Sequence, residues 1–381
     1  MLELHQLRPT WAEINLNNIA FNFRSVKHFV GKTLNYMAVV KADAYGHNSI
    51  ECSRRLEQEG IDWFGVALPE EALELRLAGI RLPILCLGGF WLGQEEFLLT
   101  HNITPVIYQI ENAESYNRIA KSQNIIASVH IKIDTGMGRI GVRFDEVKAF
   151  ADKLLEFKNL KIDGLMTHFA AADNLFETDF TNLQIDRFYK ALEIFHEKGF
   201  HPINIDLANS PGAIAHQRSH GNLVRLGGVL YGLGADVLPQ NIEIPLLKPV
   251  LSLYSQITHL KNVPKGESIG YSRKFNTQKD SIIATIPIGY QDGLPRVLSN
   301  KGKVIVNGCF APIVGNISMD WTILDVTSIP NVKLHDKVVI IGNQNGLHIT
   351  AEEIAQNCET ISYEITCGIN RRVTRKYVGS Q

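Results

Sequence analysis

One lysine stands where a reactive amine is expected. Lys41 follows the apolar run at residues 36–40 and precedes Tyr45 and Gly46. Burial at the end of a strand lowers the pKa of a lysine, because desolvation penalises the ammonium ion, and the neutral amine can form a Schiff base with an aldehyde or ketone. The alternative is a lysine that reaches solvent along its aliphatic stem. This segment alone leaves both interpretations open.

Other polar residues fall where an apolar strand pattern gives way to a loop. Lys132 precedes the glycine-rich segment 134–141, His168 ends the next apolar run, and Arg225 lies in the last one. A random distribution would place such charges on helix surfaces that face water. In a barrel of parallel strands, residues at these positions meet at the rim where catalysis takes place.

Glycines and one serine at the same kind of position suit a phosphate group. Glycine allows backbone amides to approach an anion closely, and the Ser210 hydroxyl adds a donor. The glycines concerned are Gly136, Gly138, Gly212, Gly227 and Gly228. A single glycine more often serves turn geometry only, so the prediction depends on their shared placement. A Schiff-base lysine beside a phosphate site indicates pyridoxal 5'-phosphate.

Alternating strand and helix patterns would position these residues. Short apolar runs occur at residues 37–40, 63–68, 83–87, 104–108, 127–133, 162–166, 203–207 and 224–231. The segments between them repeat apolar residues at three- and four-residue steps, which is typical of helices. Repeated strand–helix–strand units need parallel pairing, and about eight of them close into a (β/α)8 barrel. We expect this α/β, TIM-type barrel at residues 13–243.

The pattern changes after residue 244. Strand-rich stretches broken by Gly, Pro and Asn occur at residues 250–260, 282–288, 303–306, 321–326 and 338–341. Only residues 350–356 are predicted to be helical there, with Thr350 as the N-cap. The sequence therefore predicts a mainly-β second domain at residues 244–381.

The composition excludes several classes of function. A chain of 381 residues is expected to form two domains, and its net charge of -1 predicts neither nucleic-acid nor membrane partners. The five cysteines show no CxxC pair or metal-ligand spacing, so no metal site or disulfide framework is predicted. No apolar run approaches the ~18 residues of a membrane span, and the N-terminus lacks a signal-peptide pattern, so we expect the cytoplasm.

Motifs along most of the chain resemble those of bacterial alanine racemases. The matching segments, in chain order, are RPTWAEI (8–14), AVVKADAYGH (38–47), KIDTGMGRIG (132–141), LMTH (165–168), ANS (208–210), VRLG (224–227), IGYS (269–272), TIPIGY (285–290) and SMD (318–320). The resemblance implies a barrel that holds pyridoxal phosphate on Lys41 and a β domain that residues 1–12 join. It also implies a head-to-tail homodimer that interconverts L- and D-alanine and supplies D-alanine for peptidoglycan.

Racemisation needs an acid/base on each face of a planar carbanion at Cα. The resemblance assigns Lys41 to one face and Tyr271, supplied by the partner subunit, to the other. A tyrosine has a reference pKa near ~10 and is a poor base unless a neighbouring cation lowers that pKa. In the family a histidine that matches His168 contacts this tyrosine and the arginine that matches Arg225. The alternative for Tyr271 is a strand tyrosine packed inside the β domain.

Arg225 separates racemases from decarboxylases with a similar barrel. An arginine beside the pyridine nitrogen stays protonated and only donates, so the ring is a weaker electron sink than one with a carboxylate partner. A less stabilised carbanion is reprotonated sooner, which favours racemisation. The alternative is an arginine that pairs with Asp or Glu at the end of the barrel.

The resemblance also assigns roles around the cofactor and the substrate. Arg139 matches an arginine that binds the cofactor ring oxygen and the substrate carboxylate, as a planar donor fork suits. Lys132 matches a lysine that many members carry in carbamylated form. The phosphate contacts are matched by Tyr45, Ser210 and the amides of Gly227 and Gly228. Met319 matches a residue whose backbone amide meets the substrate carboxylate, and Tyr290 and Asp320 match residues at the substrate entrance.

This chain departs from the family pattern at three positions. Arg371 aligns where many members have a tyrosine that touches the phosphate, Asn316 replaces a frequent arginine, and Ser318 replaces a frequent cysteine. Arg371 either binds the phosphate by charge or points to water. Because this position borders the substrate, a serine or broader small-amino-acid racemase stays an alternative. A non-catalytic cofactor-binding barrel is a further alternative, which the extra β domain with Tyr271 and Met319 disfavours.

Overall fold

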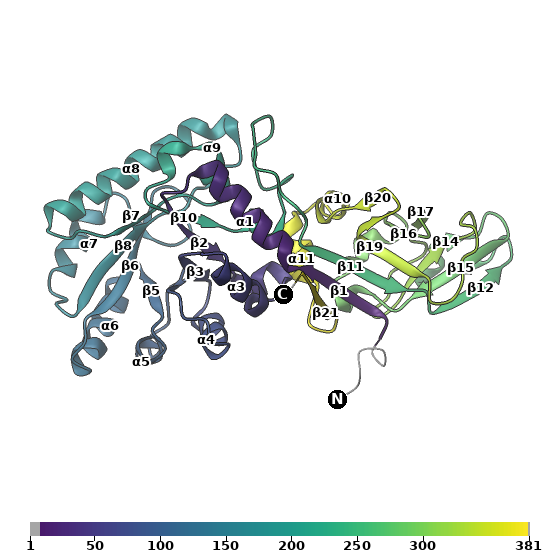
Figure 1. Cartoon of the computed structure of the whole chain (residues 1–381), viewed down its shortest axis with the longest axis horizontal. Helices are drawn as coiled ribbons and strands as arrows, with labels where there is room; N and C mark the ends of the chain where they lie inside the picture. The colour runs from purple at the N-terminus through teal and green to yellow at the C-terminus, as the bar shows by residue number, and fades with distance from the viewer. Residues whose placement is uncertain (1–7, 380–381) are drawn as a thin grey trace. The chain divides into compact units, whose positions relative to one another are not determined.

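The computed structural model describes residues 8–379 and divides the chain into two compact units (Figure 1). The barrel unit consists of Ile19–Ala44 and Ser49–Lys248. Among the described residues, the β unit contains residues 8–18, the short segment Tyr45–Asn48, and residues 249–379, and the first seven of the residues 1–12 expected to join it lie outside the described part. The segment that follows Lys41 therefore leaves the barrel unit for four residues and returns to it.

Eight parallel strands form the barrel, in the order β10-β2-β3-β4-β5-β6-β8-β9. Their bounds are β2 (Asn35–Val39), β3 (Trp63–Val66), β4 (Ile84–Cys86), β5 (Thr104–Ile107), β6 (Ala127–Asp134), β8 (Leu160–Met166), β9 (Asn204–Asp206) and β10 (Leu223–Leu226). Helices alternate with these strands, as Figure 1 shows: α1 (Leu16–Val30), α3 (Ser49–Gln58), α4 (Pro69–Leu77), α5 (Glu95–Thr100), α6 (Ile110–Ser122), α7 (Val147–Leu154), α8 (Thr178–Glu197) and α9 (Ser210–Ala215).

Backbone contacts bring β9 and β10 together, so the barrel is nearly closed. The Asn222 amide donates to the Ile205 carbonyl at 3.0 Å, and the Arg225 amide donates to the Ala208 carbonyl at 2.9 Å. The expected (β/α)8 architecture is thus confirmed. One predicted strand is shorter than expected, because β10 ends at Leu226 and a 3-10 turn, η4 (Gly228–Tyr231), follows Gly227.

Apolar side chains from several strands fill the interior. The buried cluster consists of Met37, Leu85, Val106, Met166 and Leu223, each 1% exposed or less. Such packing makes the inside of a small barrel a core instead of a channel. Reactive groups can therefore gather only at its ends.

The β unit is built on one large and two small sheets. The large sheet has the order β17-β16-β19-β11-β1-β21, with β20 paired to β19. Its strands are β1 (Thr10–Asn15), β11 (Leu251–Gln256), β16 (Lys303–Val306), β17 (Cys309–Pro312), β19 (Lys337–Gln344), β20 (Leu347–Ile349) and β21 (Thr374–Val378). The small sheets contain β12 (His259–Val263), β15 (Ser281–Ile286) and β18 (Thr322–Asp325), and β13 (Ser268–Ile269) with β14 (Phe275–Asn276).

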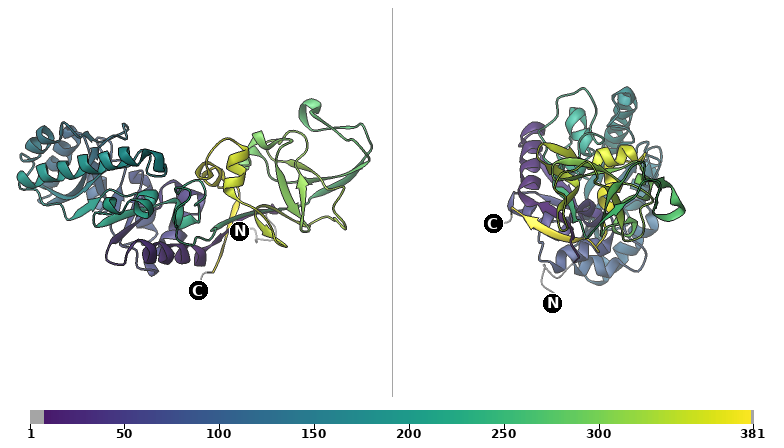
Figure 2. Two further views of the ribbon diagram at one scale, coloured as in Figure 1. Left: turned by 90° about the horizontal axis from the view of Figure 1, so that it is seen from above. Right: turned by 90° about the vertical axis from the view of Figure 1, so that its right-hand side faces the viewer.

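The mainly-β character expected of this part is confirmed, and the green-to-yellow part of Figure 2 consists largely of strands and loops. The predicted helix is present as α10 (Ala351–Asn357), and the Thr350 side chain accepts a hydrogen bond from the Glu353 amide at 3.1 Å. The expectation of a single helix was wrong. A second helix, α11 (Ser362–Gly368), follows. Its N-terminus has no side-chain cap, so the sequence carried no capping residue from which this helix could be predicted.

Candidate active site

Lys41 is separated from the end of β2 by one residue, Val40, and starts an unusual turn. Residues 42–45 all have φ between 52° and 55°, so α2 (Lys41–Gly46) runs in the left-handed region that costs ~1–2 kcal/mol per residue. Two contacts hold the beginning of this turn. The Ala42 amide donates to Glu71 Oε1 at 2.7 Å, and the Ser49 amide donates to Asp43 Oδ1 at 2.8 Å. Residues held in such a conformation often mark functional sites.

The end of this turn packs against α11 within the β unit. A Cβ atom at Gly46 would lie 2.1 Å from the Thr366 carbonyl oxygen, so only glycine fits there. Arg375 Nη2 donates to the Gly46 carbonyl at 3.1 Å. The rings of Tyr45 and Tyr363 lie 5.2 Å apart, centroid to centroid. Tyr363 was not predicted from the sequence, because it belongs to the helix that the sequence pattern did not reveal.

Arg371 is exposed, and no hydrogen bond or ion pair involves its side chain in the part of the chain that the structure describes. The aromatic neighbour of Tyr45 is Tyr363, which lies eight positions before Arg371 in the sequence. Helix α11 therefore supplies a tyrosine beside Tyr45, although position 371 has none.

Arg225 is 3% exposed and bonds to several groups at the barrel rim. Its Nη1 donates to Asp206 Oδ1 in a buried ion pair. Its Nη2 donates to the Thr167 carbonyl at 2.9 Å and to the Leu207 carbonyl at 3.1 Å, and it lies 3.3 Å from His168 Nδ1. The alternative expected for Arg225, an ion pair with an acidic residue, is therefore present. The same guanidinium group also reaches His168.

Basic groups concentrate around Arg225. Burial, together with the cations of Arg225, Arg139 and Lys41, lowers the pKa of the Lys132 amine to about 7. Burial and the same group of cations hold the pKa of His168 well below its usual range. These side chains therefore act on one another electrostatically, and a bound anion would relieve their mutual repulsion.

One buried amide links the two loops that carry Arg139 and His168. Gln184, from α8, is completely buried, and its Nε2 donates to Thr135 Oγ1 and to the His168 carbonyl, both at 3.1 Å. Its Oε1 accepts from the Ala170 amide at 3.0 Å. Gln184 was not predicted from the sequence, where its only signal is a polar residue on the apolar face of a helix.

The residues expected to bind phosphate meet at the start of two short helical turns. The Ser210 hydroxyl accepts a hydrogen bond from the Gly227 amide at 2.9 Å. Asn209 caps α9 by accepting from the Gly212 amide at 3.0 Å. Ser210, Gly227 and Gly228 are thereby brought together although they are separated in sequence, as the barrel prediction requires.

The residues of the β unit that are expected to contact the substrate or to line its entrance lie on the surface of that unit. Tyr271 is 72% exposed, Met319 is 50% exposed and Tyr290 is 40% exposed. Tyr271 begins the 3-10 turn η5 (Tyr271–Arg273), and its carbonyl accepts from Asn316 Nδ2 at 2.9 Å. The alternative of a tyrosine packed inside the β domain is therefore wrong.

Two family models match the chain. The model of the alanine racemase N-terminal domain matches residues 14–235, and that of the C-terminal domain matches residues 250–377. The chain belongs to the alanine racemase family. The alanine racemase of Halothermothrix orenii is 45% identical over 377 residues, which cover 97% of each chain. That of Syntrophobacter fumaroxidans is 41% identical over 365 residues, which cover 95% of this chain and 96% of the relative.

Solved alanine racemase structures share the whole fold. The enzyme of Clostridium difficile 630 has a TM-score of 0.91 at 36% identity, covering 97% of this chain and 96% of that one. The alanine racemase from Bacillus anthracis with bound L-Ala-P has a TM-score of 0.91 at 35% identity, covering 97% and 95%. The one from Bartonella henselae, described with covalently bound pyridoxal phosphate, has a TM-score of 0.87 at 31% identity, covering 97% and 99%.

The barrel unit of this family member suits an anionic carbonyl compound. Lys41 is one of the cations that lower the Lys132 and His168 pKa values, and the Ser210 hydroxyl is held at a strand end by the Gly227 amide. Both features fit pyridoxal phosphate, which carries an aldehyde and a phosphate.

Among the helices within residues 8–379, none is long and apolar enough to cross a membrane.

Proposed function

We propose that this protein interconverts L- and D-alanine by proton exchange at Cα, with pyridoxal phosphate bound to Lys41. The gathering of Lys41, Lys132, Arg139, His168 and Arg225 into one electrostatically coupled group carries the proposal. Membership of the alanine racemase family and the names of the relatives support it. A role in supplying D-alanine for peptidoglycan follows from the same resemblance.

The cofactor's ring withdraws electrons from the substrate and so acidifies the Cα proton. Lys41 would hold the cofactor covalently. Ser210, Gly227, Gly228 and Tyr45 would bind its phosphate. Arg139 would bind the ring oxygen and the substrate carboxylate.

Two bases on opposite faces of Cα would move the proton. Lys41 serves one face, and Tyr271 of the partner subunit serves the other, which makes the protein a homodimer with shared sites. Support comes from the exposure of Tyr271 and Met319 on the β unit. Mixing a Lys41→Ala chain with a Tyr271→Phe chain tests this arrangement, because only a hybrid dimer regains one intact site.

Arg225 would face the cofactor's pyridine nitrogen as a donor. Its bonds to Asp206 and to two carbonyl groups use both terminal nitrogens, and its Nε has no acceptor within residues 8–379. A guanidinium cannot give up its proton to the ring. Arg225 thus keeps the electron sink weak, which favours racemisation over decarboxylation.

Lys132 would orient Arg139 after reacting with carbon dioxide. A lysine with a pKa of about 7 is largely neutral at physiological pH, and a neutral amine is the form that reacts. Tyr290 and Asp320 would line the substrate entrance.

The cysteines are scattered and odd in number, which suits a reducing compartment and supports a cytoplasmic location.

Exchange of the Cα hydrogen tests the proposed reaction. In heavy water, either alanine enantiomer should gain deuterium at Cα and lose optical activity, and Lys41→Ala should abolish both changes. Lys121→Ala is the control, since Lys121 is an exposed lysine on α6. Carbon dioxide release, or cofactor binding without exchange, would overturn the proposal. Parallel assays with serine decide between an alanine-selective enzyme and a broader racemase.

A further inference from the structure

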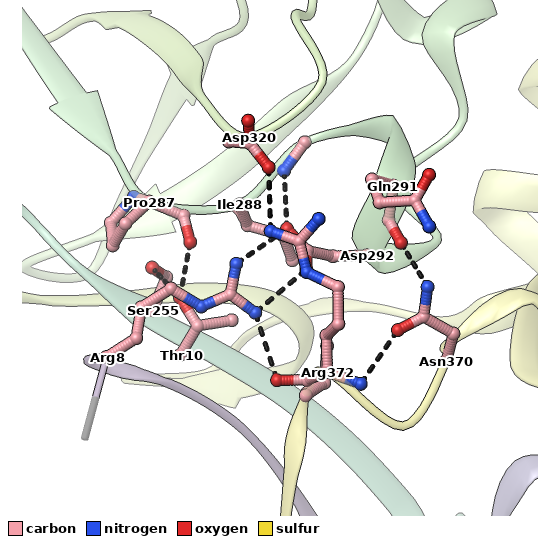
Figure 3. Close-up of polar contacts among 12 residues, drawn as sticks. Arg8, Thr10, Ser255, Pro287, Ile288, Gln291, Asp292, Asp320, Asn370 and Arg372 are labelled. Atoms are coloured by element: carbon pink, nitrogen blue, oxygen red, sulfur yellow. Dashed lines mark hydrogen bonds and ion pairs between the residues drawn. The ribbon is translucent and has the colours of Figure 1, made fainter.

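A buried carboxylate organises the surface of the β unit that carries Met319. Asp292 is completely buried and lies between Arg8 and Arg372 (Figure 3). Its Oδ2 accepts from Arg8 Nη1 at 2.9 Å and from the Gly289 amide at 3.0 Å. Its Oδ1 accepts from Arg8 Nη2 at 2.8 Å and lies 3.3 Å from Arg372 Nε. Both oxygens are therefore held by donors from distant parts of the sequence.

Arg372 extends this cluster to the residue that follows Met319. Its Nη2 donates to Asp320 Oδ1 at 2.6 Å, as Figure 3 shows. Arg8 in turn donates to the main-chain carbonyl of Arg372 at 3.1 Å. Guanidinium–carboxylate pairs with several hydrogen bonds fix orientation as well as distance. Arg372 thus links the Asp320 carboxylate to the buried carboxylate of Asp292.

The main chain on the other side of Met319 is held by the turn that Asp292 closes. The Tyr290 amide donates to the Ser318 carbonyl at 3.0 Å, and the Gln291 amide donates to the Met319 carbonyl at 3.1 Å. A Cβ atom on Gly289 would lie 2.2 Å from the Ser318 oxygen. This glycine therefore permits a backbone contact that no other residue allows.

These contacts determine where the Met319 amide points. In a trans peptide the N–H and C=O groups point in opposite directions, and no peptide bond is cis in the described part of the chain. Because the Ser318 carbonyl points to the Tyr290 amide, the Met319 N–H points away from that turn. Within residues 8–379 this N–H has no acceptor, and the Met319 side chain is half exposed. The surface thus presents one oriented donor.

We propose that Asp292, together with Arg8 and Arg372, is a positioning device for substrate recognition. It fixes the Ser318–Met319 peptide so that the Met319 amide meets the substrate carboxylate in the partner subunit. The inference rests on the proposed function, which assigns Met319 to the substrate. Asp292 itself touches neither substrate nor cofactor. Its loss should weaken carboxylate binding more than it slows proton transfer.

Asp292→Asn tests this role because it removes the charge and keeps the shape. We expect the KM for alanine and the inhibition constant of propionate, which lacks the amine, to rise together by about tenfold, with kcat changed much less. Hydrogen exchange at Tyr290 and Gln291 should become faster in the same variant. Asp336→Asn is the matched control, because Asp336 is another buried carboxylate of the β unit, bonded to Asn307 Nδ2 at 2.8 Å.

Two further variants make the outcome decisive. If Asp292→Asn does not fold, Arg372→Gln at the more exposed end of the cluster should give the same pattern to a smaller extent. Met319→Pro removes the amide hydrogen itself. If Met319→Pro raises both constants and Asp292→Asn and Arg372→Gln do not, the positioning role is overturned and the proposed function stands. If Met319→Pro changes neither constant, the assignment of Met319 fails and the inference fails with it.

Discussion

Arg225 Nη2 lies 3.3 Å from Nδ1 of His168. A guanidinium nitrogen only donates, so Nδ1 must accept and the proton of the neutral imidazole must sit on Nε2. Burial and the nearby cations hold the pKa of His168 well below its usual range, which keeps the ring neutral. His168 therefore offers an N–H donor on the side away from Arg225, where the proposed base Tyr271 of the partner subunit would bind.

The buried ion pair of Arg225 and Asp206 should dominate the stability of the barrel rim. Arg225→Gln leaves the Asp206 carboxylate buried without a cation and should lower the free energy of unfolding by ~3–5 kcal/mol, measured by urea denaturation. Adding Asp206→Asn to this variant should recover part of the loss, because the uncompensated charge is removed. Equal stability of the single and double variants would show that the unpaired Asp206 charge does not cause the loss.

In protein freed of carbon dioxide, where Lys132 carries a free amine, the stability should depend on pH through Lys132. Its pKa is lowered from the usual 10.5 to about 7 in the folded protein, so the unfolded chain binds more protons between these values. Stability should therefore increase as the pH rises from about 7 toward 10, by up to ~1.4 kcal/mol per unit, because the cost of deprotonating this amine on folding decreases. Lys132→Met should remove this slope in denaturation curves, whereas Lys121→Met should keep it.

Gly46 should not tolerate a side chain. In Gly46→Ala the new Cβ atom would meet the Thr366 carbonyl at 2.1 Å, at a φ of +84°. Gly60 is a matched control, since its φ is +79° and an added Cβ there would meet no atom within 4 Å. Gly60→Ala should cost about 1 kcal/mol, and Gly46→Ala about 2 kcal/mol more, by thermal or urea unfolding. Similar losses in both variants would show that the turn can move away from α11.

Gln184 should affect both stability and turnover. Gln184→Leu keeps the approximate volume and removes the hydrogen bonds to Thr135, His168 and Ala170, so we expect a loss of ~1–3 kcal/mol in unfolding free energy. Alanine racemisation should slow because the loops of Arg139 and His168 lose their common link. The exposed Gln123→Leu, just after α6, provides the control. A fully active, fully stable Gln184→Leu protein would contradict this role.

The sequence was informative where the barrel repeat determines position. Lys41, His168 and Arg225 follow or lie in parallel strands, and such strands deliver their last residues to one rim, so their common location could be predicted. The strands after residue 244 could be predicted because apolar runs alternate there with Gly, Pro and Asn.

The remaining features depend on contacts between distant segments. The left-handed turn after Lys41 is held by Glu71 and by packing of Gly46 on α11, which no local pattern encodes. Helix α11 has no side-chain cap, so Tyr363 could not be placed beside Tyr45. Gln184 looks like an ordinary helical residue until the fold brings two rim loops to its amide.

Covalent attachment of the cofactor to Lys41 is the central claim. Borohydride reduction of protein supplied with pyridoxal phosphate, followed by proteolysis and mass spectrometry, locates the amine that carries the cofactor. We predict a reduced pyridoxyl group on the peptide that contains Lys41 and on no other lysine in stoichiometric amount. Attachment at a different lysine, or none in protein saturated with the cofactor, would contradict it.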